Sequence, residues 1–173
     1  YDLCKELGGP PLRQPDPSYS DTIKELEETI GGTLQLNGDR FQLKSKTGIL
    51  ESHLMAEGHR KLATLLHLLA NGSLTRDSIL FWDEPEANLN PKLIKVVARI
   101  LRRLAQNGIQ IFLASHDYLL TGELSIASEY KTEPDVPIRF FALTHETPES
   151  PVTLDAGDTL ADLKHNPILE EFA

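Results

Sequence analysis

The sequence predicts an α/β protein, because an amphipathic helix stands between two short apolar strands. The strands are expected over residues 78–83 and 109–115, and the helix begins at Pro91, whose fixed φ suits a first helical position. Two strands joined by a helical crossover lie parallel in one sheet, and the crossover is right-handed in nearly all known cases. We therefore expect a mostly parallel sheet flanked by helices.

The composition is that of one ordinary globular domain. The chain has 173 residues, of which 40% are hydrophobic and 25% charged, enough to bury a core. Its 17 Lys and Arg against 26 Asp and Glu give a formal charge of −9, which argues against a broad nucleic-acid-binding surface. No apolar run is long enough to span a bilayer, and the single cysteine, Cys4, suits a reducing cytosol, so we expect a cytoplasmic protein without a membrane partner.

Caps and turns predict the elements that precede the central unit. Residues 1–18 are rich in Gly and Pro and indicate a linker. Residues 20–30 predict a short helix, since Ser20 and Asp21 offer N-cap oxygens and a pair of glycines follows. The alternation over residues 33–46, around an Asn-Gly pair, predicts an antiparallel hairpin.

Apolar runs predict the remaining elements. Leucines on one face of residues 57–70 indicate a deeply buried helix. The continuous apolar run over 78–83 is typical of a strand buried on both faces, which makes Phe81 and Trp82 core residues. A further strand is expected over 138–143.

Two adjacent carboxylates, Asp83 and Glu84, stand at the C-terminal end of the first predicted strand. Ligands of open α/β sheets bind at that edge, and an Asp in this position holds Mg²⁺ in folds that transfer phosphate. Glu84 would orient or deprotonate a water molecule there. The alternative is a strand that runs into a solvated acidic loop, ended by Pro85.

His116 follows the second predicted strand and so emerges at the same edge of the sheet as Asp83. An imidazole in this position can donate a hydrogen bond to a terminal phosphate oxygen and respond to its loss. A single histidine in such a loop is more often structural, but its place beside two carboxylates favours a functional role.

A third segment, residues 54–61, leads into the leucine-rich helix. The free N–H groups and the dipole of a helix start attract anions, and Gly58 would let a phosphate approach the backbone. Alternatively, Glu57 only complements the helix dipole, and the segment by itself favours this second explanation.

In this order, the segments resemble the C-terminal half of an ABC-type ATPase domain. They correspond to a signature loop (55–60), a Walker B strand (79–84), a D-loop (86–91) and the switch histidine His116. The Glu-Gly pair and the Asp-Glu-Pro-Glu-Ala-Asn-Leu-Asn-Pro run are closer to the soluble branch with SMC, RecF-like and OLD-family proteins and the AAA family ATPases of bacterial defence. The resemblance covers residues 30–143 and implies a P-loop NTPase core.

The resemblance also implies roles for single residues. Asp83 would hold Mg²⁺, Glu84 would position the attacking water, and His116 would contact the γ-phosphate of ATP. Two such domains enclose ATP head to tail in this family, which implies a second ATPase subunit, most simply a second copy. The signature residues would face the partner's nucleotide, and the D-loop would line the dimer interface. These positions are Ala56, Glu57, Gly58, His59, Asn88 and Asn90.

The chain departs from the family pattern in three ways. Ala56 stands where many relatives have a serine that contacts the γ-phosphate, and Asn90 stands where transporters have an aspartate. No Gly-x-x-x-x-Gly-Lys-Ser/Thr run occurs, so the cradle for the α and β phosphates and its lysine are missing. We therefore expect a preceding N-terminal P-loop half of the same protein, and no ATP hydrolysis by this chain alone.

The expected organisation is a linker over 1–18, the C-terminal half of an ABC-type ATPase domain over 19–145, and a tail over 146–173 with short helical turns. The expected function is Mg²⁺-dependent ATP hydrolysis by the larger protein, in DNA repair or bacterial defence.

Two other function classes remain open. The first is a non-hydrolysing, nucleotide-gated module that controls a nuclease or another effector, which Ala56 favours and Glu84 disfavours. The second is a metal-dependent hydrolase or nuclease that uses Asp83, Glu84 and His116 as ligands.

DNA is a weaker partner candidate. Positive charge gathers on the helix that follows the acidic motif, although helices often solvate their outer face in this way. The residues are Lys92, Lys95, Arg99, Arg102 and Arg103.

Overall fold

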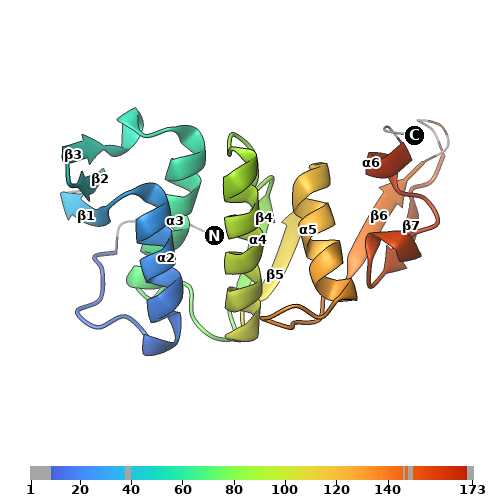
Figure 1. The fold of residues 1–173 in the computed structure, drawn as a ribbon, viewed down its shortest axis with the longest axis horizontal. Coiled ribbons are helices and arrows are strands. Elements are labelled where there is room, and N and C mark those ends of the chain that lie inside the picture. Colours follow the sequence, from blue (N-terminus) through green and yellow to red (C-terminus); the bar gives the residue numbers. More distant parts are fainter. Residues whose placement is uncertain (1–8, 38–39, 146, 148–149, 171–173) are drawn as a thin grey trace.

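The computed structural model describes residues 9–37, 40–145, 147 and 150–170, and its elements follow one another along a long axis (Figure 1). Helices α2 and α3 with a small sheet lie at one end, α4 with β4 and β5 in the middle, and α5 with β6 and β7 toward the other end. The elements are η1 (Pro17–Tyr19), α2 (Ser20–Ile30), β1 (Thr33–Asn37), β2 (Arg40–Ser45), β3 (Gly48–Glu51), η2 (Ser52–Leu54), α3 (Glu57–Ala70), β4 (Ile79–Asp83), α4 (Pro91–Gln106), β5 (Gln110–Ala114), α5 (Tyr118–Glu129), β6 (Phe140–Thr144), β7 (Thr153–Gly157), η3 (Leu160–Asp162) and α6 (Pro167–Glu170).

The N-terminal part confirms the short helix and the hairpin. Helix α2 ends at Gly31, whose φ of 81° is the left-handed conformation of a helix C-cap. The expected cap at its start is wrong, because Ser20 is already helical and Asp16 instead caps the preceding turn η1. Strands β1 and β2 pair antiparallel, whereas the central residues of their turn, 38 and 39, lie outside the described residues. Strand β3, which the sequence pattern did not indicate, pairs with β2.

The core lies between α2, α3 and α4. As predicted, the leucine face of α3 is buried, and Leu62, Leu66 and Leu69 are each at most 2% exposed. They join Leu26 of α2 and Leu104 of α4 in one apolar cluster. Helix α4 thereby connects the N-terminal part of the chain to strands β4 and β5, which pack against the same cluster.

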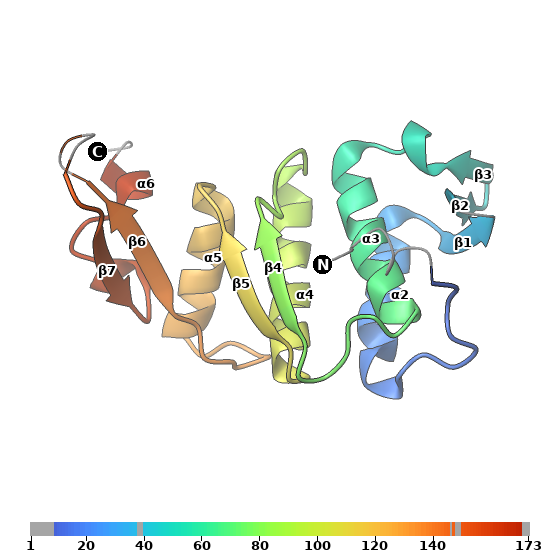
Figure 2. The ribbon, with the colours of Figure 1, turned by 180° about the vertical axis from the view of Figure 1, so that it is seen from behind.

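The central strand–helix–strand unit is confirmed. Strands β4 and β5 are parallel, with Ile79 opposite Gln110 and Asp83 opposite Ala114. Helix α4 connects them and covers one side of the pair, as the view from behind shows (Figure 2). The carboxyl ends of the two strands therefore lie next to each other, which is the condition that the predicted site requires.

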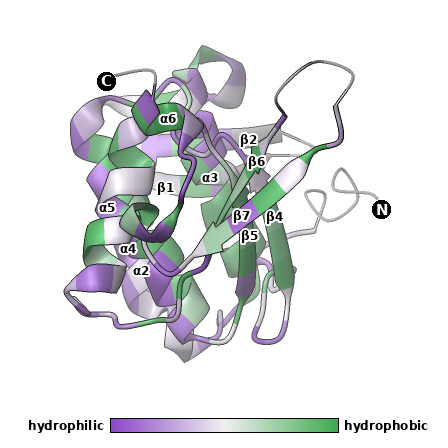
Figure 3. Cartoon of the chain, turned by 90° about the vertical axis from the view of Figure 1, so that its right-hand side faces the viewer, coloured by the Kyte–Doolittle hydropathy of each residue, from purple (hydrophilic) through white to green (hydrophobic). Residues whose placement is uncertain are grey.

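The other face of this strand pair is open, so burial on both faces is wrong. Phe81 is 74% exposed and Phe112 is 44% exposed, and their rings stack with centroids 5.0 Å apart. Trp82, whose side chain alternates with that of Phe81 along the strand, packs against the core as expected. Figure 3 places the apolar strands β4 and β5 on the side of the molecule opposite the helices. A continuous apolar run thus marks a face that nothing in the described part of the chain covers.

The predicted strand over 138–143 is present but begins two residues later. Strand β6 begins at Phe140 and pairs antiparallel with β7, and among the described residues it does not pair with β5. The parallel sheet therefore contains only β4 and β5 in the part of the chain that the structure describes. Helix α5, which also lacked a sequence prediction, packs against α4 through Leu120 and Leu124.

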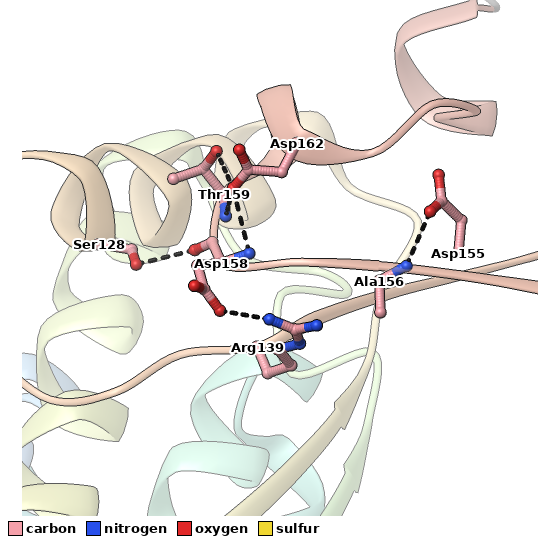
Figure 4. A network of polar contacts seen from close by, with 7 residues as sticks. All are labelled: Ser128, Arg139, Asp155, Ala156, Asp158, Thr159 and Asp162. Carbon is pink, nitrogen blue, oxygen red and sulfur yellow. Dashed lines mark hydrogen bonds and ion pairs between the residues drawn. The ribbon is translucent and has the colours of Figure 1, made fainter.

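The segment after residue 145 contains a strand as well as the expected helical turns. The amide of Leu160 donates to the hydroxyl of Ser125 at 2.9 Å, and the hydroxyl of Ser128 donates to the carbonyl of Asp158 at 2.8 Å. Both contacts attach the segment to α5, and Figure 4 shows the second within a wider polar network. No helix within the described residues is both long and apolar enough to cross a membrane.

Candidate functional site

The ends of β4 and β5 bring the predicted acidic motif and the predicted histidine together. The amide of Glu84 donates to the carbonyl of Ala114 at 2.8 Å, which continues the strand pairing by one residue. Oε1 of Glu84 then lies 3.1 Å from Nδ1 of His116. The two side chains are 43% and 80% exposed, so both can reach a ligand from solvent.

Glu84 has an unusual backbone conformation. Its φ is 45°, in the left-handed region that non-glycine residues rarely adopt, and Pro85 follows it. Such strain costs on the order of 1–3 kcal/mol and persists only where neighbouring contacts hold it. One of them is the Lys61 ammonium group, which donates to the carbonyl of Glu84 at 2.7 Å. The sequence pattern gave no signal for Lys61, because the contact joins two segments far apart along the chain.

Asp83 ends β4 with an exposed side chain that makes no hydrogen bond within the described residues. Mg²⁺ is commonly bound through one or two carboxylates together with substrate phosphates and water, and one exposed aspartate fits that mode. No group of three or more His, Cys, Asp or Glu side chains in the described part of the chain could hold a metal ion by itself. Among the described residues, a site with Asp83, Glu84 and His116 as three metal ligands therefore finds no support.

The start of helix α3 packs against the segment that follows the acidic motif. Gly58 is buried, and a Cβ atom on it would lie 2.6 Å from the carbonyl oxygen of Asn88 and 2.6 Å from a methyl group of Leu89. The structure thus gives a reason for glycine here that differs from the predicted approach of a phosphate. Asn88 itself has a φ of 64°, which turns the chain toward helix α4.

The other predicted binding residues lie at two helix starts. Ala56 and Glu57 are exposed at the start of α3, which has no side-chain cap, and His59 is half-buried one residue beyond Gly58. Asn90 has a local task, since its side-chain oxygen accepts hydrogen bonds from the second and third residues after it. That cap explains Asn90 without a ligand.

Two residues for which no individual role was predicted connect the strand-end loops. The hydroxyl of Ser115 donates to Oε1 of Glu86 at 2.6 Å, and Glu86 is only 6% exposed. Glu86 lies two residues after Glu84, and only its burial in the structure distinguishes it from an ordinary exposed acidic residue.

The basic helix α4 is mostly engaged within the chain. Arg99 and Arg103 both pair with Glu25 of helix α2, the latter at 2.6 Å. Arg102 is buried and donates to the backbone carbonyls of Thr132 and Pro134. Lys95 pairs with Glu123 of α5 at 2.8 Å. These contacts engage four of the five basic side chains that made this helix a DNA-binding candidate.

The chain matches a known protein family and a described relative. Residues 9–122 match the family described as "AAA domain, putative AbiEii toxin, Type IV TA system". A protein of Methanosarcina acetivorans, described as "Putative ABC transporter ATP-binding protein", is 29% identical over 119 residues. That alignment covers 62% of this chain and 41% of the relative, so the chain spans less than half of the relative's length.

Solved structures resemble the chain at low sequence identity. A structure described under ATP-driven dimerization and DNA-stimulated activation of SMC ATPases has a TM-score of 0.56 and 12% identity, and the match covers 89% of this chain and 94% of that one. The Smc head domain of Pyrococcus yayanosii has a TM-score of 0.59 and 17% identity, with 90% and 28% covered. The chain therefore has the fold of an SMC ATPase head.

Proposed function

We propose that this chain, which belongs to the AAA-domain family of ABC-type and AAA-type ATPases, is the C-terminal half of a larger ATPase. That larger protein would bind ATP and hydrolyse it with Mg²⁺. The observation that carries the proposal is the 3.1 Å approach of Glu84 and His116 at the carboxyl edge of two parallel strands. Ligands of open α/β sheets bind at this edge, so the pair lies where a phosphate would arrive.

Each side chain has a role that its chemistry supports. Asp83 would hold Mg²⁺, which neutralises charge on the phosphates when it is bound. Glu84 would orient the attacking water, and His116 would donate to the terminal phosphate. Catalysis would rest on positioning and on electrostatic stabilisation, because phosphoryl transfer requires little covalent chemistry from the protein.

The open apolar face supports a missing half as the partner. The exposed rings of Phe81 and Phe112 would be unfavourable in a protein that left β4 and β5 uncovered, since burial of aromatic side chains is stabilising. A preceding P-loop half that lies on β4 and β5 would cover these rings. It would also supply the phosphate cradle and additional parallel strands, which together would form the mostly parallel sheet.

A second copy of the protein is the proposed partner across ATP. The uncapped start of α3, with Ala56 and Glu57 exposed and His59 half-buried, would face the nucleotide of the other subunit. Gly58 would act indirectly: because it has no side chain, the 86–90 segment packs closely against it, and Asn88 and Asn90 would then lie near the interface. The similarity to structures described for ATP-driven dimerization supports this arrangement.

The proposed cellular setting is DNA repair or bacterial defence. DNA repair or bacterial defence fits the family and the DNA-stimulated SMC ATPases among the similar structures. A nuclease or another effector would then respond to ATP-driven dimerisation. The single cysteine supports a cytoplasmic location.

Steady-state phosphate release from ATP by the full-length protein tests the proposal. We expect release that requires Mg²⁺ and is lost in the Asp83→Asn variant, because the amide removes the negative charge that binds the cation. Binding of ATP without release, in both wild type and variant, would instead support the non-hydrolysing module. That alternative draws its support from Ala56, which lacks the serine hydroxyl.

A further inference from the structure

Glu86 is a buried carboxylate that the roles described above leave unexplained. It is 6% exposed, although acidic side chains are seldom buried without partners. Oε1 accepts from the Ser115 hydroxyl at 2.6 Å, whereas Oε2 has no hydrogen-bond partner within the described part of the chain. Burial of a half-satisfied carboxylate costs stability, and the hydrogen bond from Ser115 offsets only part of that cost, so the burial of Glu86 requires a reason other than stability.

Ser115 extends this contact to the loop that carries His116. The Ser115 oxygen accepts from the amide of Asp117 at 3.1 Å, and the Asp117 carboxylate caps α5 by accepting from the amide of Leu120 at 2.7 Å. His116 thus lies between two residues that hydrogen bonds hold in place. Its own ring is 80% exposed and contacts Glu84, so the neighbouring residues determine where the ring lies.

The other end of the link belongs to the loop that carries Glu84. The amide of Ala87 donates to the carbonyl of Glu84 at 3.1 Å, and the amide of Leu89 donates to the carbonyl of Glu86 at 3.0 Å. These two turns join Glu84 and Glu86 to the segment that packs on Gly58. The hydrogen bond from Ser115 is therefore a side-chain bridge between the two loops of the site.

We propose that Glu86 is a positioning residue, which acts through Ser115 to hold His116 within reach of Glu84. The inference rests on the proposed function, because His116 matters for turnover only if ATP binds at this edge. The bridge also couples the 86–90 segment to the histidine, so docking of a second copy on that segment would change the position of His116.

Variants of the full-length protein test the bridge. We expect Glu86→Ala and Ser115→Ala each to lower kcat about tenfold, the value of one hydrogen bond, with KM for ATP changed less than about twofold. Amides of residues 113–119 should exchange faster with deuterium in both variants. Glu86→Gln and Ser115→Thr keep the acceptor and the hydroxyl and should restore both readouts. Ser128→Ala, which loses a serine hydrogen bond to the Asp158 carbonyl, is the matched control and should change neither.

The double variant and the wild type separate the remaining outcomes. If Glu86 acts through Ser115, the double alanine variant is no slower than the slower single variant, and losses that multiply would overturn the inference. Unchanged kcat and unchanged exchange in both single variants would overturn it as well. If the wild type does not hydrolyse ATP, the proposed function fails, while the exchange rates still decide whether Glu86 restrains the loop. If Glu86→Ala does not fold, Ser115→Ala, which loses only a hydroxyl, gives both readouts.

Discussion

Glu84 and His116 meet at 3.1 Å because two parallel strands, rather than a local turn, place them side by side. Glu84 comes directly after the last paired residue of β4, and His116 comes two residues after the last paired residue of β5. The amide of Glu84 still donates to the carbonyl of Ala114 on the other strand. A displacement of one strand along the other would separate the pair. The geometry of the site is thus a property of the strand register.

The first prediction concerns Glu84→Gln in the full-length protein. The amide keeps the size of the side chain but cannot accept a proton or hold the water as the carboxylate does, so turnover should fall by at least about 100-fold. ATP binding should remain, and ATP should trap a dimer. Phosphate release and sedimentation with ATP measure these effects. The exposed Glu129→Gln on α5 is the control, and wild-type hydrolysis by the Glu84 variant would reject the assigned role.

The second prediction concerns the contact between Gly58 and Asn88. Alanine at position 58 would place a methyl group 2.6 Å from a backbone oxygen, so Gly58→Ala should lower the free energy of unfolding by about 1–3 kcal/mol. At Gly122 of helix α5, apart from its chain neighbours and the nearby backbone of its own helix, no atom of the described residues lies within 4 Å of the place that a methyl group would take. Gly122→Ala should therefore raise stability by about 0.5–1 kcal/mol. Urea denaturation of both variants compares them. Equal effects would contradict the close packing at Gly58.

The third prediction concerns the open face of β4. Phe81 is 74% exposed in this chain, so Phe81→Glu would have little effect if the face stayed open. If a preceding half covers it, the variant buries a charge and should lower the Tm of the full-length protein by several degrees. Ile49, which is 62% exposed on β3, gives the control variant Ile49→Glu. Equal Tm values for the two variants would show that no such cover exists.

The fourth prediction concerns the C-terminal network of Figure 4. The hydroxyl of Thr159 donates to Asp162 at 2.9 Å, and this contact with nearby amides lowers the pKa of the Asp162 carboxyl below its usual 3.8. A lowered pKa stabilises the folded state above pH 3.8, and this contribution is lost as the pH falls through the folded-state pKa. Asp162→Ala should therefore lower the Tm at pH 6 and change it much less at pH 2. A difference that stays the same at both pH values would contradict this origin.

Local chemistry made several elements predictable. Pro91 and the apolar face of residues 91–106 indicated helix α4, and Gly31 indicated the end of α2. Alternation around the Asn-Gly pair indicated the pairing of β1 with β2. These signals depend on φ preferences and on side-chain periodicity, which neighbours along the chain determine.

Contacts between distant segments could not be predicted in the same way. The apolar run of β4 indicated burial on both faces, yet burial depends on what lies over the strand, and Phe81 is exposed. Strand β6 pairs with β7, whose sequence Thr-Leu-Asp-Ala-Gly gave no strand signal. Lys61, Glu86 and Ser115 became site residues only when their hydrogen bonds were visible.

The sequence by itself determined the order of the motifs and the parallel strand pair, because the crossover rule restricts how a strand, a helix and a strand can connect. It also determined that Asp83, Glu84 and His116 follow the ends of those strands. Only the tertiary structure decided that Glu84 contacts His116, that Gly58 is buried by Asn88 and that one apolar face is open. These features arise from packing between segments far apart along the chain, and no local preference encodes them.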